Sequence, residues 1–420
     1  MVRPRLLEDA REALGAETVG AASAEDIVDE LQPQIVAAPG DAAGVSRALA
    51  WAGRHKLGVV IRGRGTRLGW GPPPHRFDLL LSTAKLDAIV EHRYGDLTAT
   101  VQAGATLADV NRVLATHRQW LPLDPPDAER TTIGGLLATN DSGPRRHRYG
   151  APRDLVIGIE VARADGRLVK GGGIVVKNVA GYDLPRLFTG SFGSLGVIVA
   201  ATFKLFPVAP ASRTVVAETK HAAAAAALAA AIHGSQVTPT AIEIAGPPFV
   251  VLVRFESVEA AVVAQAERAS RIATTQGATV REIEGTAEAE RWTAHNAPAG
   301  ANGDTVVKVN VLATETASML TWIEEHVPAG TWSVTGRAGL GVLYLRLSGE
   351  ADAQARIVSD IRDRLPMGRG SAVVLGGTPA LKRLVDVWGP IGDAAPLMRT
   401  VKRQFDPGGI LNPGRGPGGL

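Results

Sequence analysis

A glycine- and arginine-rich segment, RGRGTRLGWGPPP at residues 62–74, carries the clearest sign of chemistry in this chain of 420 residues. Its glycines at positions 63, 65, 69 and 71 allow backbone N–H groups to turn inward and approach a ligand closely, and such concave nests bind phosphate. The interleaved Arg62, Arg64 and Arg67 add charge and forked donors that suit phosphate oxygens. On this segment alone, a surface turn that binds nothing is an equal alternative.

The residues after this loop argue against a nicotinamide dehydrogenase. A dinucleotide-binding Rossmann loop reads G-x-G-x-x-G and opens a helix whose N-terminus holds the pyrophosphate. Here Leu68 stands where the third glycine belongs, and the prolines at 72–74 prevent a helix from starting. The segment therefore predicts a phosphate cradle made of loop alone.

Two later segments could also face a ligand. In TTIGGLLATNDSG (131–143), Gly134 and Gly135 permit close backbone approach, and threonine, asparagine and serine offer short polar side chains to a flat heterocycle or its phosphates. A helix N-cap followed by a turn explains the same residues. Within 145–198, Lys177, Arg186 or the RRHR cluster at 145–148 could place a cation beside a developing anion, although a solvated or salt-bridged surface role is the better explanation of any single one.

The composition limits the possible functions. The chain has no cysteine, which excludes disulfides, thiolate zinc sites, a cysteinyl–flavin bond and an iron–sulfur cluster held by this chain. The N-terminus is charged throughout, and the longest apolar run, around 222–232, is far below the about 20 residues of a membrane helix. We expect a cytoplasmic protein without direct membrane insertion. The net charge of +3 and the single basic cluster at 145–148 argue against nucleic-acid binding.

The elements that must position these segments alternate between strand and helix patterns. Strands are predicted at 35–39, 57–61, 77–82, 96–104 and 196–208, with helices at 41–56 and from Thr106. Residues 155–172 read as a hairpin that turns at Asp165-Gly166. Beyond 210, strands alternate with alanine-rich helices, which predicts an antiparallel sheet with helices on one face. We predict an α+β fold divided into a helical leader (1–30), a first domain (31–209), a second domain (210–390) and a C-terminal segment (391–420) that returns to the first domain.

Five segments in order carry a family resemblance. RGRGTRLGWG, TIGGLLATNDSG, RYGAPRDLVIGIEV, VVKNVAGYDLPRLFTGSFGSLGVI and FDPGGILNPGR resemble the FAD-linked oxidases of the vanillyl-alcohol oxidase type, with particular likeness to the FAD-binding subunits of bacterial glycolate oxidases. The resemblance implies a PCMH-type FAD-binding domain of two subdomains, with an α+β cap domain over the flavin.

The resemblance also implies which residues bind FAD. The first loop would wrap the pyrophosphate, and the second segment would run beside the pyrophosphate, ribityl chain and isoalloxazine. Residues 196–198, at the end of the fourth segment, would contact the adenosine half, and the C-terminal segment would return to the flavin. The implied contacts are Arg62, Gly63, Arg64, Gly65, Thr66, Arg67, Thr132, Ile133, Gly134, Gly135, Ala138, Thr139, Ser142, Gly143, Gly196, Val197, Ile198 and Asn412.

Departures from the family pattern are informative. Relatives that tether the flavin often place a histidine in the first loop, where Thr66 and Arg67 stand here, so we expect non-covalent FAD. The histidine-rich cap motif of relatives that oxidise 2-hydroxy acids alone is missing, and histidines such as His233 and His295 are scattered singly. No catalytic base is identified, and no metal is expected.

The resemblance implies an oxidoreductase that acts on CH–OH groups in glyoxylate metabolism. The chain would be the FAD-binding subunit of a glycolate or other 2-hydroxy-acid oxidase, working with a catalytic flavoprotein subunit and an iron–sulfur subunit, and reaching the inner face of the membrane only through partners. Two alternatives stay open: a self-sufficient FAD enzyme for another alcohol or acid, and a redox-inert nucleotide-binding scaffold.

Overall fold

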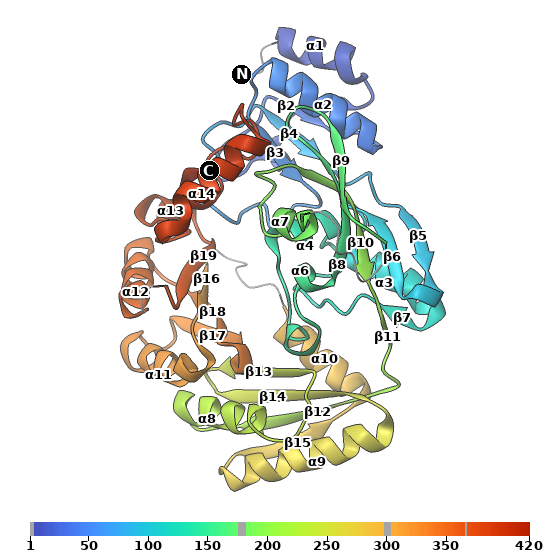
Figure 1. Cartoon of the computed structure of the whole chain (residues 1–420). Coiled ribbons are helices and arrows are strands. Elements are labelled where there is room, and N and C mark those ends of the chain that lie inside the picture. The colour runs from blue at the N-terminus through green and yellow to red at the C-terminus, as the bar shows by residue number, and fades with distance from the viewer. Residues whose placement is uncertain (1–3, 175–181, 298–303, 366–367) are drawn as a thin grey trace. The chain divides into compact units, whose positions relative to one another are not determined.

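The computed structural model describes residues 4–174, 182–297, 304–365 and 368–420, and its contacts separate two compact units. The first unit comprises residues 1–142, 151–207 and 390–420, and the second comprises 143–150 and 208–389. Mixed helices and sheets in both units confirm the predicted α+β class (Figure 1). The octapeptide 143–150 groups with the second unit, whereas the sequence analysis placed it in the first domain.

The first unit begins with a small sheet whose centre is parallel. Its strands lie in the order β1 (Val19–Ala21), β2 (Ile35–Ala37), β4 (Leu79–Ser82) and β3 (Val59–Arg62). Helices α1 (Pro4–Leu14) and α2 (Ala42–Arg54) bury side chains such as Leu14, Leu49 and Trp51 against it. The predicted N-cap Asp41 accepts a hydrogen bond from the Gly44 N–H at 2.6 Å. Because β1 pairs with β2, the N-terminal 30 residues are part of this sheet rather than a helical leader alone.

A second, antiparallel sheet completes the first unit. Its strand order is β5 (Ile89–Arg93), β6 (Thr98–Gln102), β10 (Val197–Lys204), β8 (Val156–Ala162) and β9 (Leu168–Gly172). The predicted hairpin is present as β8 and β9, and Gly166 in its turn has φ +82°. The remaining elements are α3 (Leu107–Leu114), β7 (Gln119–Trp120), α4 (Ile133–Thr139), α6 (Pro152–Leu155), α7 (Leu184–Phe188), β11 (Phe206–Pro207) and α14 (Ala395–Phe405). The two sheets bury separate hydrophobic cores.

The second unit is built on one antiparallel sheet of eight strands. Their order is β15 (Thr279–Ile283), β12 (Ala211–Glu218), β14 (Val250–Ser257), β13 (Ala241–Gly246), β17 (Trp332–Arg337), β18 (Val342–Leu347), β16 (Thr305–Asn310) and β19 (Ser371–Gly376). The helices are α5 (Arg146–Tyr149), α8 (Ala222–His233), α9 (Glu259–Thr275), α10 (Gly285–His295), α11 (Thr316–His326), α12 (Ala351–Arg364) and α13 (Pro379–Leu384).

The helices of the second unit do not all cover the same face of its sheet. Helices α8, α9, α11 and α12 share one core with every second strand residue, including Ile242, Val253 and Leu345. Helix α10 packs Trp292 against the opposite set, which includes Ala241 and Leu252. The expectation of helices on one face was therefore wrong for α10. None of the helices in the described ranges is long and apolar enough to span a membrane.

Candidate functional site

A groove open to solvent crosses the first unit and encloses about 770 Å³. Three of the segments singled out in the sequence meet there: the glycine-rich loop after β3, helix α4, and the turn before β10, joined by the end of the C-terminal segment. Of the residues expected to contact FAD, those lining the groove are Arg62, Gly63, Arg64, Gly65, Thr66, Arg67, Thr132, Gly134, Gly135, Ala138, Thr139, Gly196, Val197, Ile198 and Asn412.

The glycine-rich loop presents unused backbone donors to this groove. The loop leaves β3 at Arg62, and no helix precedes β4 at Leu79, as the prolines at 72–74 predicted. Within the described part of the chain, the N–H groups of residues 63–67 donate to no carbonyl or side chain, although all five residues line the groove. Adjacent N–H groups with no internal partner form an anion-binding nest. The residues present therefore fit a diphosphate.

The approach of this loop to α4 requires glycine at position 63. A Cβ atom built on Gly63 would lie 2.2 Å from the Thr132 hydroxyl oxygen, far inside van der Waals contact. Thr132 is itself held as the N-cap of α4, because its Oγ1 accepts a hydrogen bond from the Gly135 N–H at 3.3 Å. The groove thus keeps its width only because the loop carries no side chain at this point.

The three arginines of the loop have different environments. The Arg67 guanidinium is buried and donates to Asp141 and Thr131, so it holds the loop against the segments that flank α4. Arg62 is paired with Asp26 at 2.8 Å. Arg64 is exposed and forms no ion pair with any of the described residues. All three residues line the groove, and their contact with a pyrophosphate stays a prediction.

The end of the C-terminal segment secures the same loop. Asn412 accepts a hydrogen bond from the Ile61 N–H at 3.3 Å and donates its side-chain amide to the Phe192 carbonyl. Arg415, which sequence reasoning missed, is 5% exposed and donates to the carbonyls of Leu68 and Trp70. A basic residue in a glycine/proline-rich tail gave no sign of this role.

Three expected contacts are absent from the lining of the groove. Ile133 is fully buried in the core of the second sheet, since it is the first residue of α4 and faces inward. Ser142 is 2% exposed and its N–H donates to the Asp141 carboxylate. Gly143 groups with the second unit. Groove residues that the sequence analysis did not name as FAD contacts include Thr83, Phe192 and Gly193.

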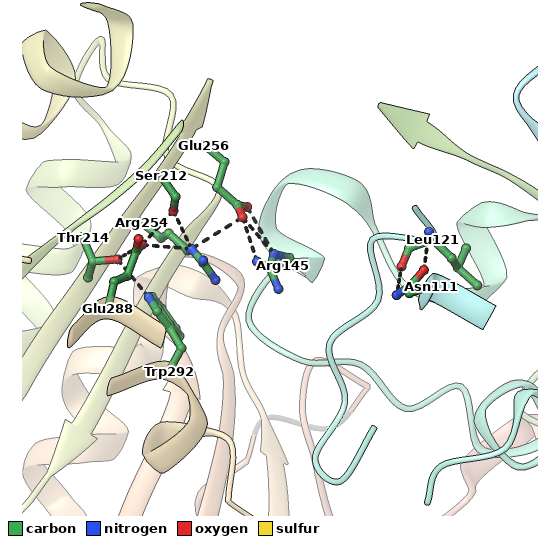
Figure 2. A network of polar contacts seen from close by, with 9 residues as sticks. All are labelled: Asn111, Leu121, Arg145, Ser212, Thr214, Arg254, Glu256, Glu288 and Trp292. Atoms are coloured by element: carbon green, nitrogen blue, oxygen red, sulfur yellow. Dashed lines mark hydrogen bonds and ion pairs between the residues drawn. The ribbon is translucent and has the colours of Figure 1, made fainter. Parts of the chain in front are cut away.

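The basic cluster at 145–148 lies in the second unit, where Arg145 takes part in a buried network (Figure 2). Arg145 donates to both carboxylate oxygens of Glu256, at 2.7 and 3.1 Å. Burial would raise the pKa of Glu256, but the hydrogen bonds and charge of Arg145 and the charge of Arg254 hold that pKa below its usual value. Arg186 pairs with Asp183 at the surface, and Lys177 lies outside the described residues.

Figure 2 also shows the polar interior behind Glu256. Arg254 reaches Glu288 at 3.1 Å, and Glu288 accepts hydrogen bonds from Ser212 and Thr214. Trp292 donates its indole N–H to Thr214 at 2.8 Å. Of the cluster that was a candidate cation near the flavin, Arg145 is thus tied to this network, whereas Arg148 is exposed.

The histidines of the second unit are not isolated as the sequence suggested. His295 lies 2.8 Å from the Glu243 carboxylate, and both side chains are almost fully buried. The rings of His147 and His233 meet edge to face at 5.6 Å. Among the described residues, no three histidine, aspartate or glutamate side chains are placed to hold a metal ion.

Comparison with known proteins agrees with this geometry. Residues 33–172 match the FAD binding domain family. Glycolate oxidase subunit GlcD of Bacillus subtilis is 29% identical over 91% of this chain and 88% of its own length. Glycolate oxidase subunit GlcE of Escherichia coli is 36% identical over 36% of this chain and 43% of its own length.

Solved structures show the same fold at low sequence identity. The substrate-bound crystal structure of p-cresol methylhydroxylase superposes with a TM-score of 0.74 and 15% identity, covering 98% of this chain and 96% of that one. The FAD binding domain, the glycolate oxidase relatives and this fold confirm the resemblance read from the five segments. The chain is an FAD-dependent oxidoreductase that carries an FAD binding domain at 33–172, is similar to a glycolate oxidase subunit along most of its length, and shares the fold of p-cresol methylhydroxylase.

Proposed function

We propose that this chain is the FAD-binding subunit of a glycolate-type oxidase or dehydrogenase and takes part in the oxidation of a 2-hydroxy acid. The observation that carries the FAD site is the row of unused N–H donors at residues 63–67, which matches the requirement of a diphosphate. The 2-hydroxy-acid class is supported by the likeness to GlcD along most of the chain.

Different residues of the groove would contact different parts of FAD. The amides of the glycine-rich loop and the Arg64 guanidinium would bind the diphosphate, because both are donors without internal partners among the described residues. Thr132, Thr139 and Asn412 would bind polar edges of the cofactor, and Gly193 and Gly196 allow it to approach the main chain. When bound, FAD supplies the two-electron acceptor for oxidation of the C–OH group. No cysteine or first-loop histidine is present for attachment, so the cofactor is non-covalent.

Because the chain holds no iron–sulfur cluster, electrons from the flavin would leave through a partner, a quinone or oxygen. Iron–sulfur clusters are held chiefly by cysteine thiolates, and this sequence contains no cysteine. A catalytic flavoprotein subunit and an iron–sulfur subunit are the partners we propose, supported by the likeness to both GlcD and GlcE. The complex would be cytoplasmic and could lie at the inner face of the membrane through those partners.

The test is reconstitution of the purified chain with FAD, followed by anaerobic addition of glycolate or D-lactate. We expect the flavin spectrum to appear, to be lost on acid precipitation of the protein, and to bleach with a 2-hydroxy acid only when the partner subunits are co-purified. Rapid bleaching in the isolated chain would favour a self-sufficient enzyme. Bound flavin that no substrate or partner reduces would favour an inert scaffold, and failure to take up FAD would contradict the proposal itself.

A further inference from the structure

A buried lysine in helix α14 joins two segments that border the FAD groove. Lys402 is 8% exposed, and its ammonium donates to the carbonyls of Ser194 and Leu411, both at 2.8 Å, and to the Asp406 carboxylate at 2.7 Å. The three donor hydrogens of the ammonium therefore each have an acceptor. Burial lowers the pKa of Lys402, and the charge and hydrogen bond of Asp406 oppose that fall.

Asp406 organises the turn that follows the helix. It is 2% exposed and accepts hydrogen bonds from the N–H groups of Ile410 and Leu411, at 3.0 and 2.8 Å. This turn leads the chain alongside β3, where Val59 donates to the Ile410 carbonyl and accepts from the Asn412 N–H. The side chain of Asn412 is thereby aligned with the groove.

The two segments that Lys402 joins belong to different cores of the first unit. Helix α14 packs Val401 and Phe405 against the core of the antiparallel sheet, and the Phe405 ring meets that of Phe188 at 5.4 Å. Ile410 and Leu411 instead lie in the core of the small parallel sheet. Ser194 ends the turn whose Phe192 and Gly193 line the groove. The ammonium therefore sits where the two subdomains bordering the groove are joined.

Replacing a buried ion pair by well-packed apolar side chains often leaves the stability of a protein unchanged or raises it. Stability alone therefore does not explain the buried pair of Lys402 and Asp406. We propose that Lys402 is a positioning residue for FAD, which fixes the turn at 192–196 and residues 410–412 against each other and so sets the spacing of the groove. The inference rests on the proposed FAD site. Lys402 itself does not line the groove.

The test compares the pair with a half-buried cation of the second unit. Lys402→Met combined with Asp406→Asn removes both charges and leaves one amide oxygen to accept from the N–H of either Ile410 or Leu411. The control is Arg362→Met, since Arg362 also donates to backbone carbonyls, those of Ala372 and Asp386, but lies in the second unit. Both variants are measured for FAD dissociation constant and for apo-protein melting temperature.

We expect the double variant to raise the FAD dissociation constant by about tenfold, the value of one hydrogen bond to a charged group. The control is expected to lower the melting temperature without changing FAD affinity. An unchanged FAD affinity in a folded double variant would overturn the proposal, as would an equal affinity loss in the control, because either result describes a merely structural pair.

Hydrogen exchange of the apo-protein separates this inference from the FAD site itself. We expect amides in 190–196 and 410–412 to exchange faster in the double variant and not in the control. Unchanged protection would overturn the positioning role. The wild-type chain could fail to take up FAD while the amides of 190–196 and 410–412 still exchanged faster in the double variant. In that case the proposed function would be wrong, but the role of Lys402 in holding the two segments together would be supported.

Discussion

Arg67 and Asp141 form an ion pair that is almost completely removed from solvent. Their side chains are 7% and 4% exposed, and the Arg67 Nε lies 2.9 Å from the Asp141 Oδ2. The same guanidinium donates to the hydroxyls of Thr66 and Thr131, at 2.8 and 2.9 Å. The pair therefore ties the glycine-rich loop, which lines the FAD groove, to the segment that follows α4.

Breaking this pair should cost more than breaking an exposed one. We predict that Asp141→Asn destabilises the first unit by about 3 kcal/mol, because it leaves a buried guanidinium without its counter-ion. Glu91→Gln, in the exposed pair of Glu91 with Arg93, should cost less than about 1 kcal/mol. Urea unfolding of the apo-protein measures both. Equal effects of the two substitutions would show that the Arg67 pair does not brace the loop.

Arg64 should contribute to FAD affinity and not to folding. We predict that Arg64→Ala weakens FAD binding by about tenfold, as expected when a charge-assisted hydrogen bond to phosphate is lost. Its melting temperature should stay unchanged, because the side chain is exposed. Titration calorimetry at two salt concentrations is the measurement, with Arg93→Ala as an exposed control outside the groove. A normal affinity in Arg64→Ala would remove this side chain from the site.

Gly63 should tolerate no side chain. Since a Cβ there would meet the Thr132 hydroxyl at 2.2 Å, Gly63→Ala must widen the groove or move α4. We predict a loss of FAD affinity of about tenfold or more, the range of overpacking in a closely packed site. Gly69→Ala is the matched control, because its Cβ would have no atom within 4 Å.

A second substitution can separate a steric clash from other causes. Thr132→Ala in the Gly63→Ala background removes the hydroxyl that the new methyl group meets, so part of the FAD affinity should return. Fluorescence titration with FAD measures all four proteins. If Gly69→Ala weakened binding as much as Gly63→Ala, the close approach of the loop to α4 would not be the reason for glycine at position 63.

The second unit should lose stability in acid through Glu256. The pKa of Glu256 in the folded protein is lower than its pKa of about 4.3 in the unfolded chain. The ionised carboxylate therefore stabilises the fold at pH values above the unfolded pKa, and this contribution is lost as the pH falls through the folded pKa. We predict that Arg145→Met with Glu256→Gln flattens the acid limb of a stability–pH profile below about pH 4.3. An acid limb as steep as in the wild type would show that another group controls it.

Local patterns were sufficient to predict the elements around the groove. Alternating apolar residues gave β8 and β9 with their Asp165-Gly166 turn, and the prolines at 72–74 gave a loop without a helix. In the second unit, strands β15, β17 and β19 were missed. The TVREI sequence of β15 carries exposed charged residues because it is an edge strand, so its apolar pattern is weak.

The residues that the sequence could not reveal depend on contacts between distant segments. Lys402 and Asp406 have the spacing of an ordinary surface pair on a helix, and only the fold shows that both are buried. Arg145 likewise reads as part of a basic surface cluster, although its partner Glu256 is 111 residues away. Burial of a charged side chain is decided by tertiary packing, which local sequence does not encode.

A structure of the protein with FAD bound tests the central claim most directly. We predict that the diphosphate oxygens lie within hydrogen-bonding distance, about 2.7–3.2 Å, of backbone nitrogens in residues 63–67, with the Arg64 guanidinium beside them. A diphosphate bound elsewhere, with these nitrogens facing only solvent, would contradict the account.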